Sequence, residues 1–591
     1  MCGFAGERAV GRPADSEAVE RMAATMRSRG PDGEGSWSQD GVAFAHRRLK
    51  IIDLTSTGDQ PMVDPELGLT VAFNGCIYNH QELRSELERD GYRFFSTSDT
   101  EVIPKAYAKW GRDCVKRFKG MFAFALCEHA SGRVLLGRDR LGVKPLYLAH
   151  TTDSLRFAST LPALLAGGGI DTEIDPVALH HYLSWHSVVP PPRTILKGVQ
   201  KLAPAHTLQI DPDGNTTQER YWRADFSRQD RYADWSEQDW SDATLEALRT
   251  AVKRRMVSDV PVGVLLSGGL DSSLIVALLE TSGQEKLATF SIGFDDVGAR
   301  EGNEFRYSDI IAEQFDTDHH KIHVDTSRML PALDGAVHAM SEPMVSHDAV
   351  AFYLLSEEVA KSYKVVQSGQ GADEVFAGYS WYPPLFRAEG TGAEAYRKAF
   401  FDRADAEMAE TVTDAYRLDQ DPSAAFQEAH FAAAGADDPV DRGLRLDTEV
   451  MLVDDPVKRV DNMTMAWGLE ARTPFLDHEL VELAAACPPE LKLAQGGKGV
   501  LKAAARSVLP AAVIDRPKGY FPVPALSTLE GATLDLITEL MNGARARARG
   551  IFRPEHVDTL LGAPNEHLTT LEGSKLWQLA LLELWLDKHG L

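Results

Sequence analysis

The residues best suited to chemistry lie in a short turn rich in glycine and serine, at positions 267–273. The apolar run before it, 262–266, is typical of a buried parallel strand, and the apolar segment after it is typical of a helix. Glycines let the backbone approach an anion closely, and the N–H groups at a helix start face that anion. This pattern predicts a phosphate-binding turn between a strand and a helix.

Each residue type in the turn has a predicted role. The hydroxyl donors are Ser267, Ser272 and Ser273, and the close-approach glycines are Gly268 and Gly269. Asp271 would repel phosphates unless it held a hard cation, so it is predicted to bind Mg²⁺. The chain has no G-x-x-x-x-G-K-[ST] motif, and SGGLDSS instead resembles the pyrophosphate loop of enzymes that split ATP into AMP and pyrophosphate. A plain turn would explain the glycines but not the whole ordered set.

A second Gly-rich turn, SGQGADE, occupies residues 368–374. The segments between the two turns alternate in character, with strands expected at 287–294, 319–324 and 364–367 and helices at 305–314 and 348–361. Such alternation predicts a doubly wound parallel sheet, which binds ligands at the carboxyl ends of its strands. Both turns should therefore meet at one edge, where Asp373 would be a second Mg²⁺ ligand and Ser368 and Gly369 would contact adenine or ribose.

Cys2 follows the initiator methionine directly. If Met1 is removed, its thiol and the chain's α-amine belong to one residue, and an α-amine of pKa about 7.7–8.0 can act as the base for its own nucleophile. A cysteine at this position is weak evidence by itself. The five cysteines are odd in number, widely spread and without a C-x-x-C pair, which argues against a disulfide framework or a structural zinc site and favours a reducing cytoplasm.

Several motifs after Cys2 agree in order with one family. They are MCG at the start, RGPD at 29–32, AHRRLKIID at 45–53, FNGCIYN at 73–79, SDTE at 98–101 and GRDRLGVKPLY at 137–147. Together they resemble the class II glutamine amidotransferase domain. The resemblance implies an N-terminal-nucleophile fold, an α-β-β-α sandwich of two sheets between helix layers, and makes Cys2 the catalytic nucleophile.

The glutamine pocket is predicted from residue types and from this resemblance. Asn74 and Gly75 can donate to an oxyanion, Arg48 suits the carboxylate of glutamine, and Asp99 suits its ammonium group. The resemblance adds the remaining residues that should line the pocket, which are Leu49, Lys50, Ile51, Ile52 and Cys76. The family commonly has Glu where Cys76 stands. If that position contributes only backbone contacts, glutamine binding would tolerate the change. If the Glu carboxylate holds the amine of glutamine, the change would weaken binding.

The C-terminal half resembles the synthetase domain of the asparagine synthetase family, through DNMTMA at 461–466, LEARTPFLD at 469–477 and GKGVLK at 497–502. The resemblance implies an ATP site using the positions of Leu266, Ile292, Ser368 and Gly369. It also implies that Lys498 stabilises charge on the phosphates, the alternative being a helix lysine in water. The family usually has Glu in the SGEG turn, whereas this chain has Gln370, which predicts an altered acceptor pocket.

The composition of the chain limits its partners, its location and its division into domains. The chain has 591 residues, ordinary hydrophobic content and a formal charge of −25, which disfavours nucleic acid and anionic membranes as partners. No apolar run approaches the ~20 residues of a spanning helix, and the start lacks a signal peptide pattern. Prolines and charges after residue 188 predict a boundary near 215, giving a glutaminase domain at 2–215 and a synthetase domain with helical additions at 216–591. A homodimer is left open.

The two predicted sites together indicate an amide-forming relay. Cys2 would release ammonia from glutamine, ATP-Mg²⁺ would adenylate an acceptor carboxylate, and ammonia would displace AMP through a shielded passage. The strings MCGFAGE, SGQGADEVFAGYSWYPP, 447–472 and RPKGYFPVPAL at 516–526 resemble the N-acetylglutaminylglutamine amidotransferase subgroup. The alternatives are an asparagine synthetase acting on aspartate and a non-catalytic nucleotide- or glutamine-binding regulator.

Overall fold

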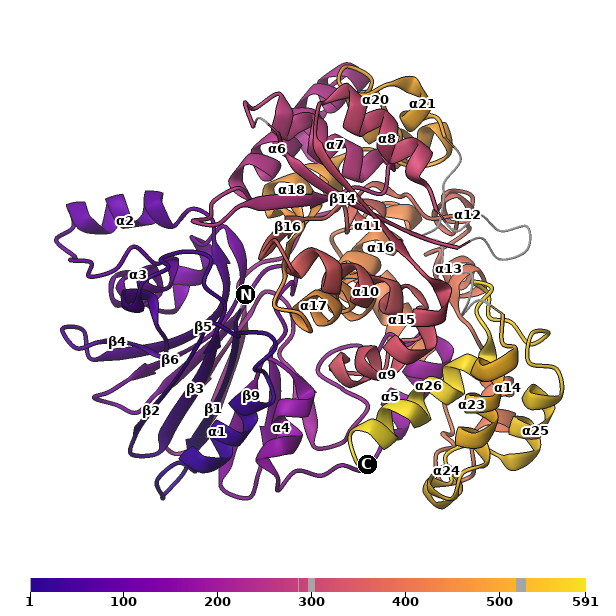
Figure 1. Ribbon diagram of the computed structural model, residues 1–591, viewed down its shortest axis with the longest axis horizontal. Coiled ribbons are helices and arrows are strands. Elements are labelled where there is room, and N and C mark those ends of the chain that lie inside the picture. The colour runs from indigo at the N-terminus through magenta and orange to yellow at the C-terminus, as the bar shows by residue number, and fades with distance from the viewer. Residues whose placement is uncertain (1, 285, 296–302, 517–527) are drawn as a thin grey trace.

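A computed structural model describes residues 2–284, 286–295, 303–516 and 528–591 (Figure 1). Most of the RPKGYFPVPAL string at 516–526 lies outside these residues. The chain forms two parts, an N-terminal pair of sheets drawn in indigo and purple and a larger C-terminal part around a third sheet. Within the described ranges, no helix is both long enough and apolar enough to cross a membrane.

The N-terminal part contains two antiparallel six-stranded sheets. The first has the order β10-β8-β9-β1-β3-β2, with bounds Val199–Lys201, Tyr147–His150, Ser154–Ala158, Gly3–Ala9, Val42–Arg48 and Gly33–Gln39. The second has the order β12-β11-β7-β6-β5-β4, with bounds Thr216–Arg220, His206–Ile210, Val134–Arg138, Gly120–Glu128, Leu69–Ile77 and Met62–Asp64. Because β12 pairs with β11, this sheet continues a few residues past the expected boundary near 215.

Helices cover the outer face of each sheet, which confirms the predicted α-β-β-α sandwich. The helices of this part are α1 (Ser16–Ala24), α2 (His80–Arg89), α3 (Val102–Trp110), α4 (Leu161–Gly167) and α5 (Pro176–Ser184). Strand β6 shows why the layers form: Phe122 and Phe124 pack with helices α2 and α3, whereas Ala123 and Ala125 pack between the sheets. Alternate residues of a strand point to opposite faces, so small side chains let the sheets approach while large ones fill the helix layer.

The C-terminal part is built on a five-stranded parallel sheet of order β15-β14-β13-β16-β17. Its bounds are Asp318–Val324, Ala288–Phe294, Val262–Leu265, Val365–Gln367 and Glu470–Arg472. Helices lie on both sides, with α6 (Glu237–Arg254) and α7 (Leu270–Glu280) on one face and α9 (Met329–Ala339) and α10 (Asp348–Ala360) on the other. The predicted doubly wound sheet is confirmed, and β17 is a strand that the periodicity did not indicate.

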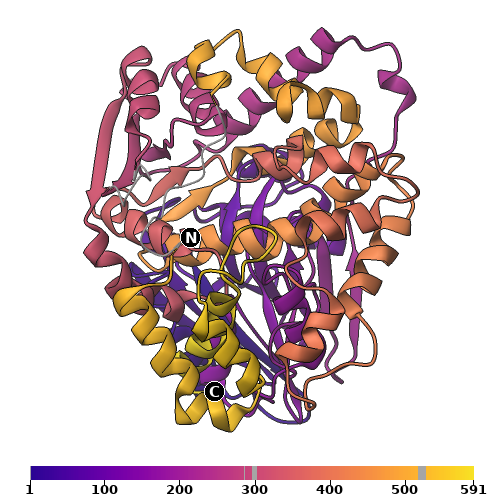
Figure 2. The ribbon, with the colours of Figure 1, turned by 90° about the vertical axis from the view of Figure 1, so that its right-hand side faces the viewer.

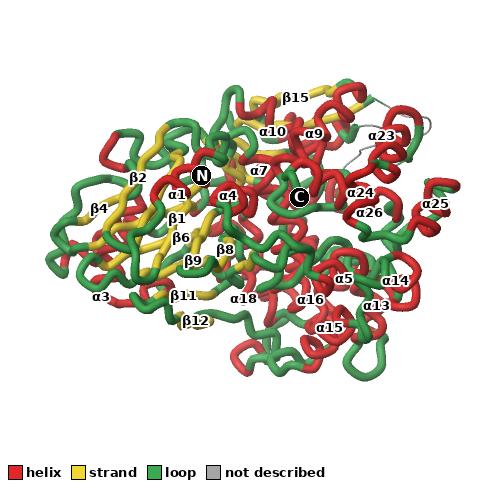
Figure 3. Tube along the Cα trace, turned by 90° about the horizontal axis from the view of Figure 1, so that it is seen from below, coloured by secondary structure: helices red, strands yellow, loops and turns green. Residues whose placement is uncertain are grey.

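Helical additions surround this sheet, and Figure 3 shows helices dominating the C-terminal side while strands gather on the N-terminal side. In Figure 2 the last four helices form a group beside the C-terminus. The remaining helices are α8 (Phe305–Gln314), α11 (Ala372–Phe376), α12 (Tyr382–Phe386), α13 (Ala393–Phe400), α14 (Asp405–Thr411), α15 (Pro422–Ala432), α16 (Pro439–Leu446), α17 (Lys458–Met465), α18 (His478–Ala486), α19 (Pro489–Leu493), α20 (Gly499–Ala505), α21 (Ala511–Ile514), α23 (Gly531–Asn542), α24 (Ala544–Arg549), α25 (Pro554–Gly562) and α26 (Lys575–Lys588).

Buried ion pairs join the two parts. Asp461 of α17 accepts from Arg29 at 2.9 Å and from Lys144 at 3.3 Å, and all three side chains are at most 5% exposed. Lys201 of β10 likewise lies 2.8 Å from Asp454. Charges removed from water remain ionised only when paired, so these contacts strongly specify how the parts dock. The docking brings the edge strand β17 against the N-terminal sandwich.

Candidate active sites

A first cavity lies around Cys2, where the N-terminal sandwich meets β17. Its walls come from the start of β1, the loop after β3, strand β5, the short 3-10 helix Asp99–Glu101 and β17. The lining residues are Cys2, Arg48, Leu49, Ile51, Ile52, Gly58, Gln60, Phe73, Gly75, Cys76, Ser98, Asp99, Thr100, Glu470 and Arg472. The structure therefore brings most of the predicted glutamine-pocket residues together.

Cys2 is buried but lines this cavity. Its backbone N–H donates to Asn74 Oδ1 at 3.2 Å, and the N–H of Leu49 donates to its Sγ at 3.5 Å. Burial raises the pKa of the Cys2 thiol, because a thiolate is poorly solvated there. The thiol therefore needs a local base to become a nucleophile, and the donor at Leu49 favours the thiolate once it forms.

Asn74 and Gly75 of strand β5 adjoin the cavity around Cys2, Asn74 through its hydrogen bond with Cys2 and Gly75 as a lining residue. Since Asn74 Oδ1 accepts from Cys2, its amide nitrogen Nδ2 is left as a donor, and that buried atom has no hydrogen-bond partner among the described residues. A side chain at Gly75 would place Cβ only 2.1 Å from the carbonyl oxygen of Met121 on β6. Only glycine fits at that position, and its neighbour supplies a donor beside the thiol.

Two other predicted pocket residues, Asp99 and Arg48, have specific contacts. Asp99 lines the cavity, and its Oδ2 accepts from the N–H of Ile77 at 2.9 Å, while burial raises its pKa. The Arg48 guanidinium donates to Thr55 O at 2.7 Å and Asp59 Oδ1 at 2.6 Å, so it is engaged with the neighbouring loop. Lys50 does not line the cavity. A bidentate contact of Arg48 with glutamine would exchange its loop partners for the substrate.

Two charged lining residues from the C-terminal part are among those that were not predicted from the sequence. Glu470 and Arg472 belong to β17 of the C-terminal part, are at most 1% exposed, and pair at 2.6 Å. Arg472 Nη2 also lies 3.8 Å from the Sγ of Cys76. Burial opposes ionisation of Glu470, but neighbouring positive charges that include Arg472 and Lys144 lower its pKa to about 2. The sequence signal for these two residues is the LEARTPFLD string at 469–477, which supported the family resemblance but gave neither side chain a role.

A larger cavity of about 580 Å³ lies at the carboxyl ends of β13, β14 and β16. Both Gly-rich turns contribute to it, as the doubly wound topology predicts. The predicted residues that line it are Leu266, Ser267, Gly269, Asp271, Ser272, Ile292, Ser368, Gly369, Gln370, Asp373 and Lys498. The two turns also touch, because a Cβ at Gly369 would lie 3.0 Å from the Cβ of Asp271.

Gly268 and Ser273 are not among the residues lining this cavity. Gly268 has φ +71°, and a Cβ there would lie 2.5 Å from the backbone nitrogen of Ser308 on α8. Its glycine is therefore required by the left-handed backbone and by close packing of α8. Ser273 is fully buried in the first turn of α7. The prediction that both act directly on phosphate is not supported by their positions.

Lys498 joins the two predicted Mg²⁺ ligands. Its Nζ lies 2.7 Å from Asp271 Oδ2 and 2.9 Å from Asp373 Oδ1, and the residue is 8% exposed. Burial opposes its charge, but the two carboxylates outweigh it and raise its pKa above the ordinary value. The alternative of a helix lysine in water is thus excluded. Because two carboxylates converge on one positive charge, this part of the cavity also fits a hard divalent cation.

The two cavities are joined by adjacent strands. Gln367 of β16 pairs with Arg472 of β17, and the N–H of Ser368 donates to the carbonyl oxygen of Arg472 at 2.8 Å. Ser368 lines the larger cavity, while the Arg472 side chain lines the one around Cys2. The two cavities therefore have walls in neighbouring strands, and one backbone hydrogen bond connects the two lining residues.

Comparison with known proteins agrees with these two sites. The asparagine synthase family model matches residues 243–587, and the glutamine amidotransferase domain model matches residues 1–222. A Bacillus subtilis protein named asparagine synthetase [glutamine-hydrolyzing] 1 is 30% identical, with 99% of this chain and 96% of that protein covered. A second from the same organism, numbered 3, is 31% identical, with 86% and 84% covered.

A third relative, asparagine synthetase B [glutamine-hydrolyzing] of Escherichia coli, is 30% identical, with 84% of this chain and 77% of that protein covered. The family model spans more than half of the chain, and the alignment with the first relative spans nearly all of it. The resemblance predicted from the motifs is therefore confirmed, and the chain belongs to the asparagine synthetase family.

Proposed function

We propose that this chain amidates the carboxylate of a short acylated dipeptide, N-acetylglutaminylglutamine, with ammonia taken from glutamine. As a member of its family the chain is an ATP-dependent, glutamine-hydrolysing amide ligase. The acceptor is the new element of the proposal. The observation that carries the two-site reaction is the hydrogen bond from Ser368 to Arg472, which joins the walls of the two cavities.

In the glutaminase half-reaction, Cys2 Sγ attacks the side-chain amide carbon of glutamine and its proton passes to the α-amine of the same residue. The unpartnered Nδ2 of Asn74 and the N–H of Gly75 support this step, since they can donate to the oxyanion that forms. Ammonia leaves, and water hydrolyses the thioester. Arg48 and Asp99 would hold the carboxylate and ammonium groups of glutamine, with Leu49, Ile51, Ile52 and Cys76 completing the wall.

In the synthetase half-reaction, an acceptor oxygen attacks the α-phosphorus of ATP, pyrophosphate leaves, and ammonia then displaces AMP. Ser267, Gly269 and Ser272 would bind the phosphates at the start of α7. Asp271 and Asp373 would hold Mg²⁺, which supplies positive charge to the phosphate oxygens when it is bound. Lys498 would then turn from the carboxylates toward the developing charge.

The passage of ammonia is proposed to follow the strands β16 and β17 between the cavities. Free ammonia is mostly protonated near neutral pH, and an ammonium ion cannot attack the acyl adenylate, so shielding from water has a chemical reason. If added labelled ammonium readily diluted the nitrogen derived from glutamine during turnover, this passage would be refuted.

The acceptor proposal depends on Gln370, which lines the larger cavity where the family usually has glutamate. A carboxylate there would suit an acceptor that carries an ammonium group, as aspartate does. An N-acetylated dipeptide has no ammonium group, and a neutral amide suits it without leaving an unpaired charge in the cavity. Aspartate remains the second candidate, because the relatives above are named asparagine synthetases.

One experiment separates these candidates. The protein is incubated with ATP, Mg²⁺ and glutamine against either N-acetylglutaminylglutamine or aspartate, and AMP and the amide are measured by mass spectrometry. We expect the dipeptide to turn over faster and Gln370→Glu to shift the preference toward aspartate. Faster turnover of aspartate by the unchanged protein would reverse the choice.

Cys2→Ala supplies the control for the two-site reaction. It should abolish the use of glutamine but spare amide formation from ammonia, whereas loss of both activities would contradict two separate sites. Amide formation would also exclude a non-catalytic regulator. We further propose a cytoplasmic location, since all five cysteines are buried free thiols, and a homodimer stays a prediction.

A further inference from the structure

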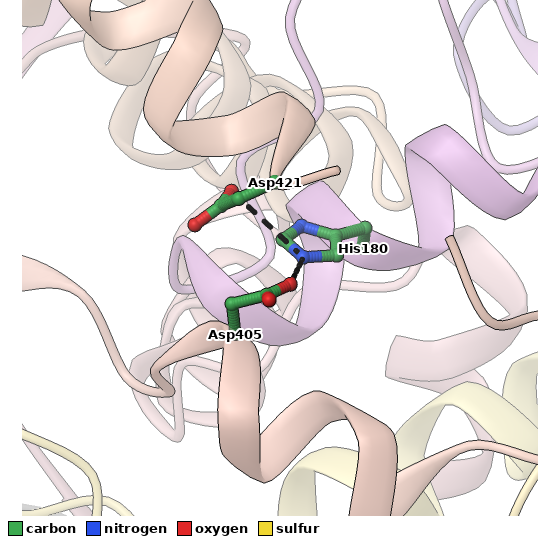
Figure 4. A group of neighbouring side chains, drawn as sticks. All are labelled: His180, Asp405 and Asp421. Atoms are coloured by element: carbon green, nitrogen blue, oxygen red, sulfur yellow. Dashed lines mark ion pairs between the residues drawn. The ribbon is translucent and has the colours of Figure 1, made fainter. Parts of the chain in front are cut away.

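Outside both cavities, three potential metal ligands meet where the N-terminal part contacts the helical additions (Figure 4). His180 lies on α5, Asp405 begins α14, and Asp421 caps the start of α15. Figure 4 shows both carboxylates directed at the imidazole ring. We propose that these three side chains form a binding site for a divalent transition metal ion of the Zn²⁺ class, linking α5 to α14 and α15.

The first support is the state of His180. The residue is 4% exposed, and its Nε2 atom has no hydrogen-bond partner among the described residues. This atom faces Asp405 and Asp421. A buried ring nitrogen is therefore directed into the cluster without a hydrogen-bond partner among the described residues. Such an unmet requirement is what a metal ion would satisfy.

The second support is the way the ring is held. His180 Nδ1 lies 2.9 Å from Ser423 Oγ, and the same hydroxyl lies 3.0 Å from His181 Nδ1. A serine has one proton to donate, so it can donate to His181 and accept from His180. In the proposed site this arrangement holds, so the proton of His180 lies on Nδ1 and the lone pair of Nε2 faces the carboxylates. The hydroxyl of Ser184, 3.3 Å from Nδ1, can accept from it as well.

The separations also fit one ion. Nε2 lies 3.6 Å from Asp405 Oδ1 and 3.8 Å from Asp421 Oδ1, and the three ligand atoms lie within 4.8 Å of one another. These nitrogen–oxygen separations are too long for hydrogen bonds. Two ligand atoms that each lie about 2.1 Å from a single Zn²⁺ ion are about 3–4 Å apart, depending on the angle between the bonds.

The ligand set and its exposure select the class of ion. Imidazole with carboxylates suits Zn²⁺ and related transition metals better than Mg²⁺, which prefers oxygen ligands alone. The side chain of Asp405 is 59% exposed and that of Asp421 is 27% exposed, so the ion can enter from solvent and keep water as a further ligand. A neutral ring with two carboxylates carries two negative charges, which a divalent ion balances.

The test uses the full chain after treatment with a chelator. Zn²⁺ is added in equilibrium dialysis at pH 7.5, and the bound metal is counted by mass spectrometry for the wild type, Asp405→Asn and His180→Gln. We expect one Zn²⁺ per chain in the wild type and at least about tenfold weaker binding in both variants, because a ligand is lost in each. Asp419→Asn, an exposed carboxylate between the same two helices, is the matched control and should bind like the wild type.

A folding readout accompanies the count. Without metal, the wild type and the variants Asp405→Asn, His180→Gln and Asp419→Asn should have equal glutaminase activity, because the cluster lies outside both cavities. Added Zn²⁺ should raise the melting temperature of the wild type but not that of Asp405→Asn. Ser423→Ala should weaken Zn²⁺ binding by about 10–100-fold, since it releases the ring. Equal Zn²⁺ binding by the wild type and Asp405→Asn would overturn the proposal. So would a wild type that binds none, which would identify the cluster as a charged histidine paired with two carboxylates.

Discussion

The buried pair of Arg472 and Glu470 should respond unequally to removal of its two partners. In Arg472→Met the carboxylate of Glu470 loses the guanidinium that lies 2.6 Å away, inside a region where both residues are at most 1% exposed. In Glu470→Gln the guanidinium keeps the carbonyl oxygens of Arg255 at 2.8 Å and Val257 at 2.7 Å. Arg472→Met removes these two hydrogen bonds as well as the ion pair, so it breaks more contacts than Glu470→Gln does.

The magnitudes follow from this asymmetry. Breaking a buried ion pair by removing one partner destabilises a fold by about 3–5 kcal/mol, which is the value expected for Arg472→Met. Loss of a hydrogen bond between charged groups costs about 1.5–3 kcal/mol, the value expected for Glu470→Gln. The pKa of Glu470 falls from its ordinary 4.5 to about 2, and this lowering corresponds to about 3 kcal/mol at neutral pH. Because that pKa is lowered, the contribution is present above pH 4.5 and is lost as the pH falls toward 2.

The assay is urea unfolding of the two single variants and the double variant, followed by far-UV circular dichroism at pH 7.5. We expect Arg472→Met to be the least stable, and the double variant to lose less free energy of unfolding than the sum of the single losses. Lys361→Met, which removes a mostly exposed pair with Glu358, should leave the midpoint unchanged. Equal losses from the two single variants, or strict additivity in the double variant, would refute the reasoning.

Two further predictions concern the catalytic groups. Asn74→Ala should lower the glutaminase kcat by about 10²–10³-fold, because it removes one oxyanion donor. Amide synthesis from ammonia should stay unchanged. Steady-state assays measure both activities, and an equal loss in both would contradict the assignment. Lys498→Met should strongly lower amide synthesis but tighten the binding of Mn²⁺ in the absence of ATP, because the lysine ammonium no longer lies between Asp271 and Asp373. Titration followed by electron paramagnetic resonance measures that affinity, and weaker Mn²⁺ binding would contradict the proposed ligands.

Local patterns were enough to predict most of the C-terminal sheet. The strand expected at 287–294 is β14, Ala288–Phe294, and the helix expected at 305–314 is α8 with the same bounds. Such elements are long and strongly periodic, so their sequences carry the signal. The three-residue strand β17 was missed because it is too short for alternation to appear, and its pairing with β16 is determined by packing.

In the two sites, too, some features could be predicted from the sequence and others depend on packing. Residue type and the family resemblance predicted Cys2, Asn74 and Lys498 as catalytic groups, since each carries a chemical group that the reaction requires. The sequence could not separate glycines that approach a ligand from glycines that pack, and Gly268 proved to be of the second kind. Nor could it show that the guanidinium of Arg48 is engaged with the loop at 52–59.

The sequence by itself determined the family and the two Gly-rich turns and predicted the nucleophile, because each is written in consecutive residues whose chemistry is local. Only the tertiary structure decided that Glu470 and Arg472 line the cavity around Cys2, from which they are 468 and 470 positions away in the sequence. Only it brought His180, Asp405 and Asp421 together. The physical reason is that burial and charge pairing between distant segments depend on how the parts dock, and no local pattern in the chain encodes that arrangement.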